Sequence, residues 1–391
     1  MQKKIIALAI AGLASTAAFA QSNVTIYGRM DLGAAYRTGD SGGVANTEGK
    51  YEIASGIGSG SRIGFKGVED LGGGLSAVFN LETGFKNDTG ALDDSKTTNT
   101  LFRRKSVVGL AGGFGTVLLG RQTDFADSIS YLTSVADFGF MTGSVGHNLD
   151  RLEGTRSNNS VSYTTNNMGG FTGNLFYGFG EQAGRTSAGQ AFGIGGKYDN
   201  GPLGLGVAYY QSKAGSTPSD TSLLAAANAT SVSSLSSVSG NTAQKVLNVA
   251  ASYQFGPARV YGNYSRVKQD LNNQANLTAV GVGSLTTVTN RTLARSNKAD
   301  IYEIGTAYSL SPSLKLLAAV DHTRANFDGV SNKAKLTQVS LGTDYWLSKR
   351  TDLYAFLAYT KATDMVNPGV SDSTGTDGNQ GAVAVGIRHK F

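Results

Sequence analysis

Residues 24–32, Val-Thr-Ile-Tyr-Gly-Arg-Met-Asp-Leu, alternate between apolar and polar side chains. In an extended strand successive side chains point to opposite faces, so Val24, Ile26 and Met30 share one face and the polar residues share the other. Similar segments of about ten residues recur along the chain, separated by breaks. The pattern predicts β-strands with one apolar and one polar face, as in a soluble sandwich or a membrane barrel.

The breaks between these segments are of two kinds, and the two kinds alternate. Short breaks rich in turn residues lie at 70–74, 112–115, 166–170, 199–202, 256–257, 311–313 and 348–351. Long polar breaks lie at 38–57, 87–100, 123–157, 181–189, 213–243, 269–298, 327–334 and 363–379. Seven turns and eight loops join sixteen strands. This predicts an all-β, sixteen-stranded antiparallel transmembrane barrel over 21–391, with short periplasmic turns and long extracellular loops.

The N-terminus has the order of features found in a secretory signal peptide. Lys3 and Lys4 precede an apolar stretch from Ile5 to Leu13, and Ala18-Phe19-Ala20 is a small-x-small cleavage signal. We therefore predict a signal peptide at 1–20. No later apolar run reaches the roughly 18 residues that a spanning helix needs.

Composition excludes several classes of function. The chain contains no cysteine, which rules out disulfides and cysteine-based metal sites, and we expect no metal and no cofactor. Charged residues make up 16%, and the formal net charge is +6, or two less without Lys3 and Lys4. This weak basic excess is consistent with an anion preference. It does not form the concentrated basic face that nucleic-acid binding requires.

Four motifs resemble those of Gram-negative porins of the neisserial and burkholderial type. They are VTIYG at 24–28, SRIGFKGVEDLG at 61–72, LGRQ at 119–122 and GIRHKF at 386–391, in that order along the chain. The resemblance implies an outer-membrane homotrimer through which ions and small hydrophilic solutes diffuse. It also implies contact with outer-membrane lipid and lipopolysaccharide, and recognition of the last strand, ending in Phe391, by the barrel-assembly machinery.

The third long break, about 123–157, is predicted to fold into the lumen as a constriction loop. Residues 128–132 could form a short helical turn, and the apolar residues of the loop could pack against the inner wall, although a loop outside the barrel stays an alternative. Opposed basic and acidic side chains in such a constriction would set up a transverse field.

The basic candidates for this constriction are Arg62, Arg104 and Arg156. Arg62 and Arg156 face the lumen by alternation, Arg156 on the same face as Ser160 and Ser162. Arg104 matches a family arginine, but alternation places it with outward residues, so Arg103 is its rival unless a bulge intervenes.

The acidic candidates are Asp124, Asp127 and Asp137 on the loop and Glu82 on the wall. Asp residues in loops often cap turns, and Glu82 could pair locally with Arg62 or Arg104. Arg29 and Asp31 face the lumen by alternation, away from the narrowest point.

Other functions remain as alternatives. A substrate-specific channel on the same barrel would differ only in lumen detail. A barrel hydrolase would use one of His147, His322 and His389, none of which accompanies a recognisable nucleophile motif. An adhesin built as a β-solenoid would show repeats of fixed period, which the variable loop lengths do not provide.

Overall fold

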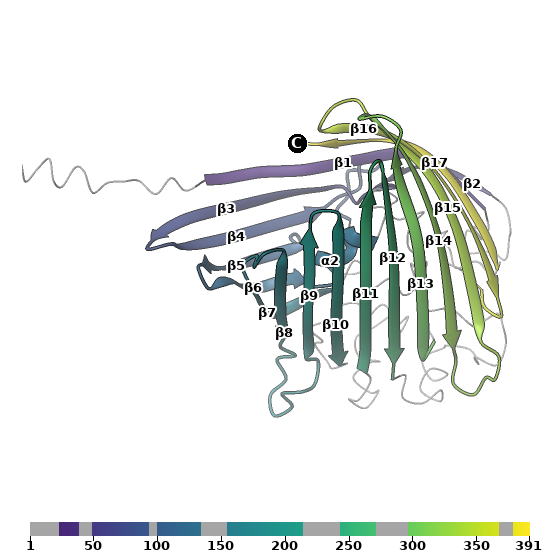
Figure 1. Cartoon of the computed structure of the whole chain (residues 1–391). Coiled ribbons are helices and arrows are strands. Elements are labelled where there is room, and N and C mark those ends of the chain that lie inside the picture. Colours follow the sequence, from purple (N-terminus) through teal and green to yellow (C-terminus); the bar gives the residue numbers. More distant parts are fainter. Residues whose placement is uncertain are drawn as a thin grey trace, which may run out of the picture.

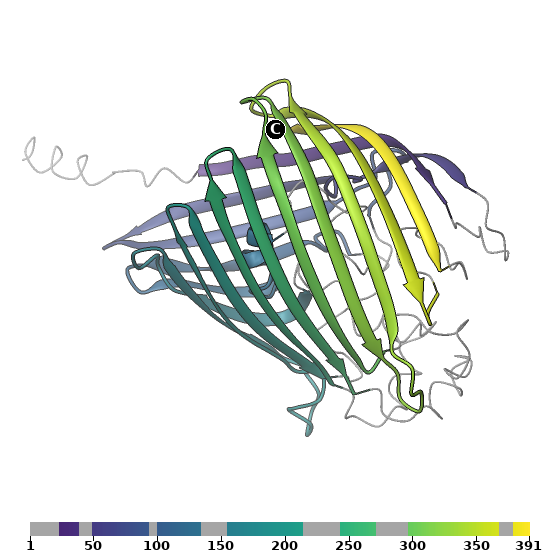
Figure 2. The same cartoon turned by 45° about the vertical axis from the view of Figure 1, so that its right-hand side comes forward.

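One antiparallel sheet closes on itself because its first strand, β1 (Asn23–Arg37), pairs with its last, β17 (Asn379–Lys390). The computed structural model describes residues 23–38, 49–93, 100–133, 155–213, 243–270, 296–366 and 378–391. The predicted signal peptide at 1–20 lies outside these residues. Figures 1 and 2 show the strands as the tilted walls of a barrel.

We call each strand that spans the barrel wall a stave, and the second stave along the chain is interrupted. β2 (Lys50–Ser55) and β3 (Arg62–Gly72) both pair with β1, through Leu32 opposite Ser55 and Arg29 opposite Arg62. Counted as one stave, β2 and β3 turn the 17-stranded sheet into the predicted sixteen. The break predicted at 38–57 is therefore too long, since residues 50–55 are strand. Residues 56–61, which we call the inner excursion, leave the wall between the two segments.

The remaining staves follow in chain order, each antiparallel to the next. They are β4 (Leu75–Gly84), β5 (Lys105–Gly112), β6 (Gly115–Thr123), β7 (Arg156–Thr164), β8 (Phe171–Gly178), β9 (Ala191–Asn200), β10 (Leu203–Lys213), β11 (Ala243–Phe255), β12 (Ala258–Gln269), β13 (Lys298–Ser309), β14 (Leu314–Asn326), β15 (Ala334–Trp346) and β16 (Thr351–Thr363). Short turns connect them at one end of the barrel and long loops at the other, as predicted.

The two faces of the wall differ as the alternation predicts. On β15, Leu341 is 51% exposed on the outer face, whereas its neighbour Ser340 is fully buried on the inner face. On β17, Val383, Val385 and Ile387 are likewise exposed. A continuous apolar outer face with a polar inner face is the arrangement of a barrel set in lipid. Among the described residues no helix is both long and apolar enough to span a bilayer.

The start of the predicted constriction loop lies inside the barrel as a short helix, α2 (Asp127–Thr133), which covers the predicted helical turn (Figures 1 and 2). Its Ile129 and Leu132 are almost fully buried together with Ala208 and Ala250 of the wall. The wall also leaves room by using glycine: a Cβ on Gly206 would lie 2.8 Å from the Ile129 side chain. The described part of the loop therefore lies inside the barrel against β10 and β11.

Candidate functional site

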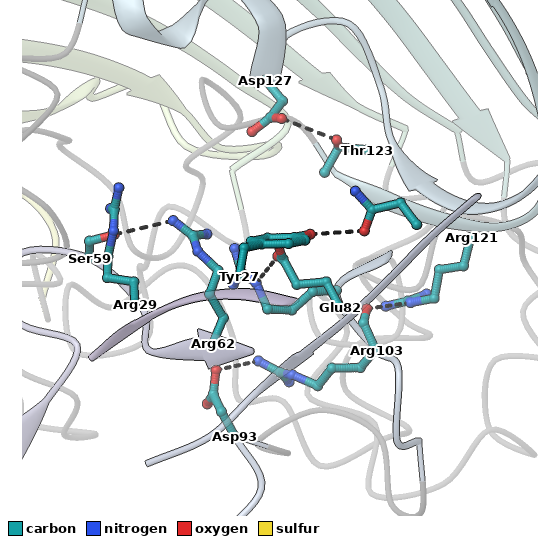
Figure 3. A network of polar contacts seen from close by, with 12 residues as sticks. Tyr27, Arg29, Ser59, Arg62, Glu82, Asp93, Arg103, Arg121, Thr123 and Asp127 are labelled. Atoms are coloured by element: carbon teal, nitrogen blue, oxygen red, sulfur yellow. Dashed lines mark hydrogen bonds and ion pairs between the residues drawn. The ribbon is translucent and has the colours of Figure 1, made fainter. Parts of the chain in front are cut away.

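Two arginines meet on the inner wall opposite α2. Arg29 of β1 and Arg62 of β3 lie directly across from each other in register. Both guanidinium groups donate hydrogen bonds to the Oγ of Ser59 in the inner excursion, Arg62 at 3.4 Å. Figure 3 shows both side chains directed toward Ser59, with Tyr27 and Glu82 beside them. The excursion thus gathers two cations at one point of the wall.

Arg104 points toward the lumen and forms an ion pair with Glu82. The distance from Arg104 Nε to Glu82 Oε1 is 2.6 Å, and Tyr27 donates its hydroxyl hydrogen to Glu82 Oε2 at 3.0 Å. The conflict over alternation is resolved without a bulge, because Arg104 precedes β5, which begins at Lys105. Glu82 thereby acts as the local partner of Arg104.

Arg103, the rival of Arg104, is directed to a different carboxylate. Its Nη2 lies 2.6 Å from Asp93 Oδ2. Its backbone carbonyl accepts a hydrogen bond from Arg121, which also donates to Asn158 Oδ1. Arg103 and Arg121 therefore continue the arginine-rich wall from β3 toward β7 (Figure 3).

The alternation of side chains along β7 is interrupted between Ser160 and Arg156. The pairing of β6 with β7 shifts between Gly120 and Gln122, and Asn159 has a φ of 50°. This irregularity brings Ser157 to the inner face, where its hydroxyl lies 3.0 Å from the Tyr210 hydroxyl. Arg156, the first residue of β7, lies directly opposite Thr123, whose hydroxyl donates to Asp127. Arg156 therefore starts its strand beside Asp127, and its lumen-facing direction stays a prediction.

Asp124 holds together the two ends of the predicted constriction loop, and we call its contacts with Thr155 the clasp. Its side chain is buried, Oδ1 accepts from the Ala126 amide at 2.8 Å, and Oδ2 accepts from the Thr155 amide at 2.8 Å. The Asp124 amide in turn donates to the Thr155 carbonyl. Oδ2 thus joins the two ends of the loop, while Oδ1 fixes the turn that leads into α2, which makes Asp124 a positioning residue.

We expect Asp124→Ala to loosen the loop without unfolding the barrel. Hydrogen bonds to a charged acceptor contribute about 1.5–3 kcal/mol each, and the substitution removes two of them. Single-channel recordings should show greater open-channel current noise and frequent steps between sublevels. Asp70→Ala is the matched control, because Asp70 caps the short turn at Gly72. Recordings of Asp124→Ala as quiet as those of Asp70→Ala would contradict the clasp.

Asp127 is the loop carboxylate that faces the open lumen. It is exposed at the first position of α2 and accepts a hydrogen bond from Thr123 Oγ1 at 3.3 Å. Figure 3 places it on the α2 side of the arginine group. Asp137, the third acidic candidate, lies outside the described residues.

Asp31 faces inward, as alternation predicts, but it is fully buried. Tyr354 donates its hydroxyl hydrogen to Asp31 Oδ1 at 2.6 Å. Nearby on the inner wall, Arg388 pairs with Asp344 and Asp352, and all three side chains are completely buried. The inner excursion covers this group, since a Cβ on Gly58 would touch Asp31 and Arg388. The group joins β1 to β15, β16 and β17 and is shielded from the pore.

Sequence reasoning missed the inner excursion and the role of Ser59. The signal was present, because 55–61 reads Ser-Gly-Ile-Gly-Ser-Gly-Ser, with a glycine at every second position. Isolated glycines inside a strand pattern mark bulges and close backbone approaches. Ile57 anchors the excursion, buried beside Tyr354 and Phe356.

The histidines named for the hydrolase alternative are placed apart. His322 and His389 each contact a threonine hydroxyl, Thr337 and Thr351 respectively, at 2.9 Å. His147 lies outside the described residues. Within the described ranges no group of three or more His, Cys, Asp and Glu side chains is arranged to hold a metal ion.

Comparisons with known proteins agree with this geometry. A family model described as Gram-negative porin matches residues 7–365. The chain is 32% identical to outer membrane porin protein 32 of Delftia acidovorans and 28% identical to an outer membrane porin protein of Bordetella pertussis, over the full length of each chain. A solved anion-selective porin from Comamonas acidovorans superimposes with a TM-score of 0.70 at 27% identity, covering 95% of this chain and 100% of that one.

The outward apolar face, the polar lumen and the short helix α2 inside it are the parts of a diffusion channel, and the family match extends over almost the whole chain. The resemblance inferred from four short motifs is therefore confirmed. The chain belongs to the Gram-negative porin family and is a diffusion porin of the outer membrane.

Proposed function

We propose that the pore is a general diffusion channel with a mild preference for anions, set by Arg29, Arg62 and Arg104. The observation that carries the proposal is the direct cross-strand placement of Arg29 and Arg62. Like charges placed directly opposite each other destabilise a sheet. A fold that accepts this repulsion beside a water-filled passage gains a site of positive potential for anions entering from solution.

The composition of the wall supports the same sign of selectivity. The arginines drawn together on this wall are Arg29, Arg62, Arg103, Arg104 and Arg121, whereas its carboxylates are Glu82 and Asp93. Asp127 stands on the α2 side and gives the field a direction across the pore. Such a field orients dipolar solutes and ordered water. The relative from Comamonas acidovorans is described as anion-selective.

The proposal includes an assembly and an export route. Residues 1–20 direct export and are removed. The barrel assembles as a homotrimer, contacts outer-membrane lipid and lipopolysaccharide, and is recognised by the barrel-assembly machinery through its last strand. Phe391 supports this use of the C-terminus, because its backbone amide and carbonyl exchange hydrogen bonds with Gly28 across the closing seam. No catalytic step is included.

Purified protein in planar bilayers tests the proposal. Under a KCl gradient the zero-current potential should have the sign of an anion-preferring pore, and the current should rise linearly with salt concentration. A panel of small hydrophilic solutes should enter liposomes at rates that fall smoothly with solute size. Saturation and block by one solute would instead favour the substrate-specific alternative, and a cation-selective potential would contradict the arginine assignment.

A further inference from the structure

A band of cations lies on the outer face of the barrel, at the long-loop end of β11–β16. We call it the basic rim, and it consists of Lys245, Arg266, Lys268, Lys298, Arg324, Lys335 and Lys361. On β15, Lys335 shares its face with the exposed Val339 and Leu341, whereas Leu336 between them is fully buried. The other members alternate with buried residues in the same way. The rim therefore faces the membrane rather than the pore.

Several of these cations are direct cross-strand neighbours. Lys268 of β12 lies opposite Lys245 on one side and Lys298 on the other. Arg324 of β14 lies opposite Lys335 of β15 on one side and opposite Asp300 of β13 on the other. Each pair of cations places like charges at the shortest spacing that a sheet offers, which is destabilising. An anion held between the strands would offset this repulsion.

The distribution of charge along the strands is asymmetric. At the short-turn end, the described outer-face residues of β11–β16 include no Lys or Arg; aromatic side chains stand there instead, among them Tyr253, Phe255, Tyr308 and Tyr345. Lysines that merely extended toward water from a membrane interface would suit both ends equally. The asymmetry therefore points to a partner present in one leaflet, and porins place their long loops on the extracellular side.

Local contacts fix part of the rim. Asp300, the single carboxylate among the described outer-face residues of β11–β16, lies 2.6 Å from Arg266 Nε and 3.0 Å from Lys298 Nζ. Tyr264 donates its hydroxyl hydrogen to Asp300 at 2.8 Å. Arg324 donates a hydrogen bond from Nε to His322 Nε2 at 3.4 Å, but neither Arg324 nor Lys335 has a carboxylate of the described residues within ion-pair distance. These two cations are therefore available to an external anion.

The outer face continues below the rim as an apolar surface. The residues exposed there include Tyr302, Val320 and Val339, each four residues along its strand from a rim cation and nearer to the short-turn end. A ligand that fits both zones has phosphate groups at one end and several hydrocarbon chains at the other. A second copy of this chain would have to present a matching row of acids, whereas the adjoining lipid-facing surface suits an amphiphile directly.

We propose that the basic rim binds the phosphorylated headgroup of an anionic, multiply acylated lipid of the outer leaflet. Arg324, Lys335 and Lys268 contact the phosphates, and the acyl chains lie along the apolar outer face beneath. This inference rests on the outer-membrane location and on the proposed contact with lipopolysaccharide, to which it gives a position. Arginine adds paired donors for phosphate oxygens, and lysine adds point charges.

Native mass spectrometry of the assembled, detergent-solubilised protein tests the proposal, with diphosphorylated lipid A as the probe. Each cation near a lipid surface contributes enough to make affinity about fivefold tighter, so Arg324→Gln with Lys335→Gln should weaken binding by roughly 30-fold. The matched control is Lys349→Gln with Arg350→Gln, which removes two cations from a short turn. Lipid A without phosphates should bind the original protein at least as weakly as diphosphorylated lipid A binds the rim variant, because Lys268 remains in that variant.

Three results would overturn the proposal: equal binding by rim and control variants, equal binding of both forms of lipid A, or a changed subunit number in the rim variant, which would make the rim a contact between copies. Bilayer conductance of the same samples separates this test from the proposed pore function. The rim variant should conduct like the original protein, because its substitutions lie outside the lumen. A sample that binds lipid but does not conduct would contradict the pore proposal alone.

Discussion

Replacement of α2, residues 127–133, by a Gly/Ser linker of equal length is expected to raise single-channel conductance about twofold. A helix with its side chains is about 10 Å across, and this one lies against the inner wall of the lumen. Conductance follows the narrowest cross-section of a water-filled pore. Without Ile129 and Leu132 to bind the wall, the linker should no longer be held as a compact obstruction.

The matched control is the same replacement at 181–187, a seven-residue stretch of the loop between β8 and β9 that contains no buried side chain. Its conductance should stay at the original value. The migration of unheated protein in SDS gels shows whether each variant forms a folded barrel. A folded α2 replacement with unchanged conductance would mean that α2 does not limit the flow of ions.

Replacing Arg29 and Arg62 together by Gln should move ion preference strongly toward cations. A unit charge about 5 Å from an ion in water contributes roughly 0.8 kcal/mol, or about a fourfold change in its local concentration. Because each charge raises the anion concentration and lowers the cation concentration by this factor, two unscreened charges would change the anion-to-cation ratio by about 300-fold. Salt shortens the reach of both charges, so we expect a measured change in the permeability ratio of at least about tenfold. Reversal potentials under a KCl gradient measure that ratio directly.

The control for this pair is again Lys349→Gln with Arg350→Gln, which removes the same net charge from a short turn. Its reversal potential should remain close to that of the original protein. A second comparison, Ser59→Ala, removes the hydroxyl that both arginines contact while leaving their charge. Equal shifts in the two double variants would show that overall charge, and not the Arg29–Arg62 pair, decides selectivity.

The fold could be predicted because two signals in the sequence agree. The alternation of side chains shows which face meets lipid. The strict alternation of short and long breaks gives the number of staves and their directions. A short helical turn is also predicted at 128–132, within a loop whose apolar residues are expected to pack against the inner wall. In the structure Ile129 and Leu132 pack against the wall where it carries small residues such as Gly206 and Ala208. These features depend on local pattern and are visible without coordinates.

The site was harder to predict because it depends on local departures from the pattern. One irregularity near Gly120 and Asn159 interrupts the alternation of β7, so counting residues from Ser160 does not fix the direction of the Arg156 side chain. The start of β5 at Lys105 frees Arg104 to turn inward. The clasp made by Asp124 joins residues 31 positions apart, which no short window of sequence reveals.

The central claim is that polar inner faces enclose water while apolar outer faces meet lipid. Because the chain contains no cysteine, single cysteines report on each face without background. Lys66→Cys lies on the inner face, where the lysine ammonium stands over the Tyr27 ring, and Val108→Cys lies on the outer face, where the valine is 60% exposed. The rate of reaction with a charged, membrane-impermeant thiol reagent, measured in liposomes, should be high at 66 and negligible at 108. Rapid reaction at 108 with protection at 66 would contradict the account.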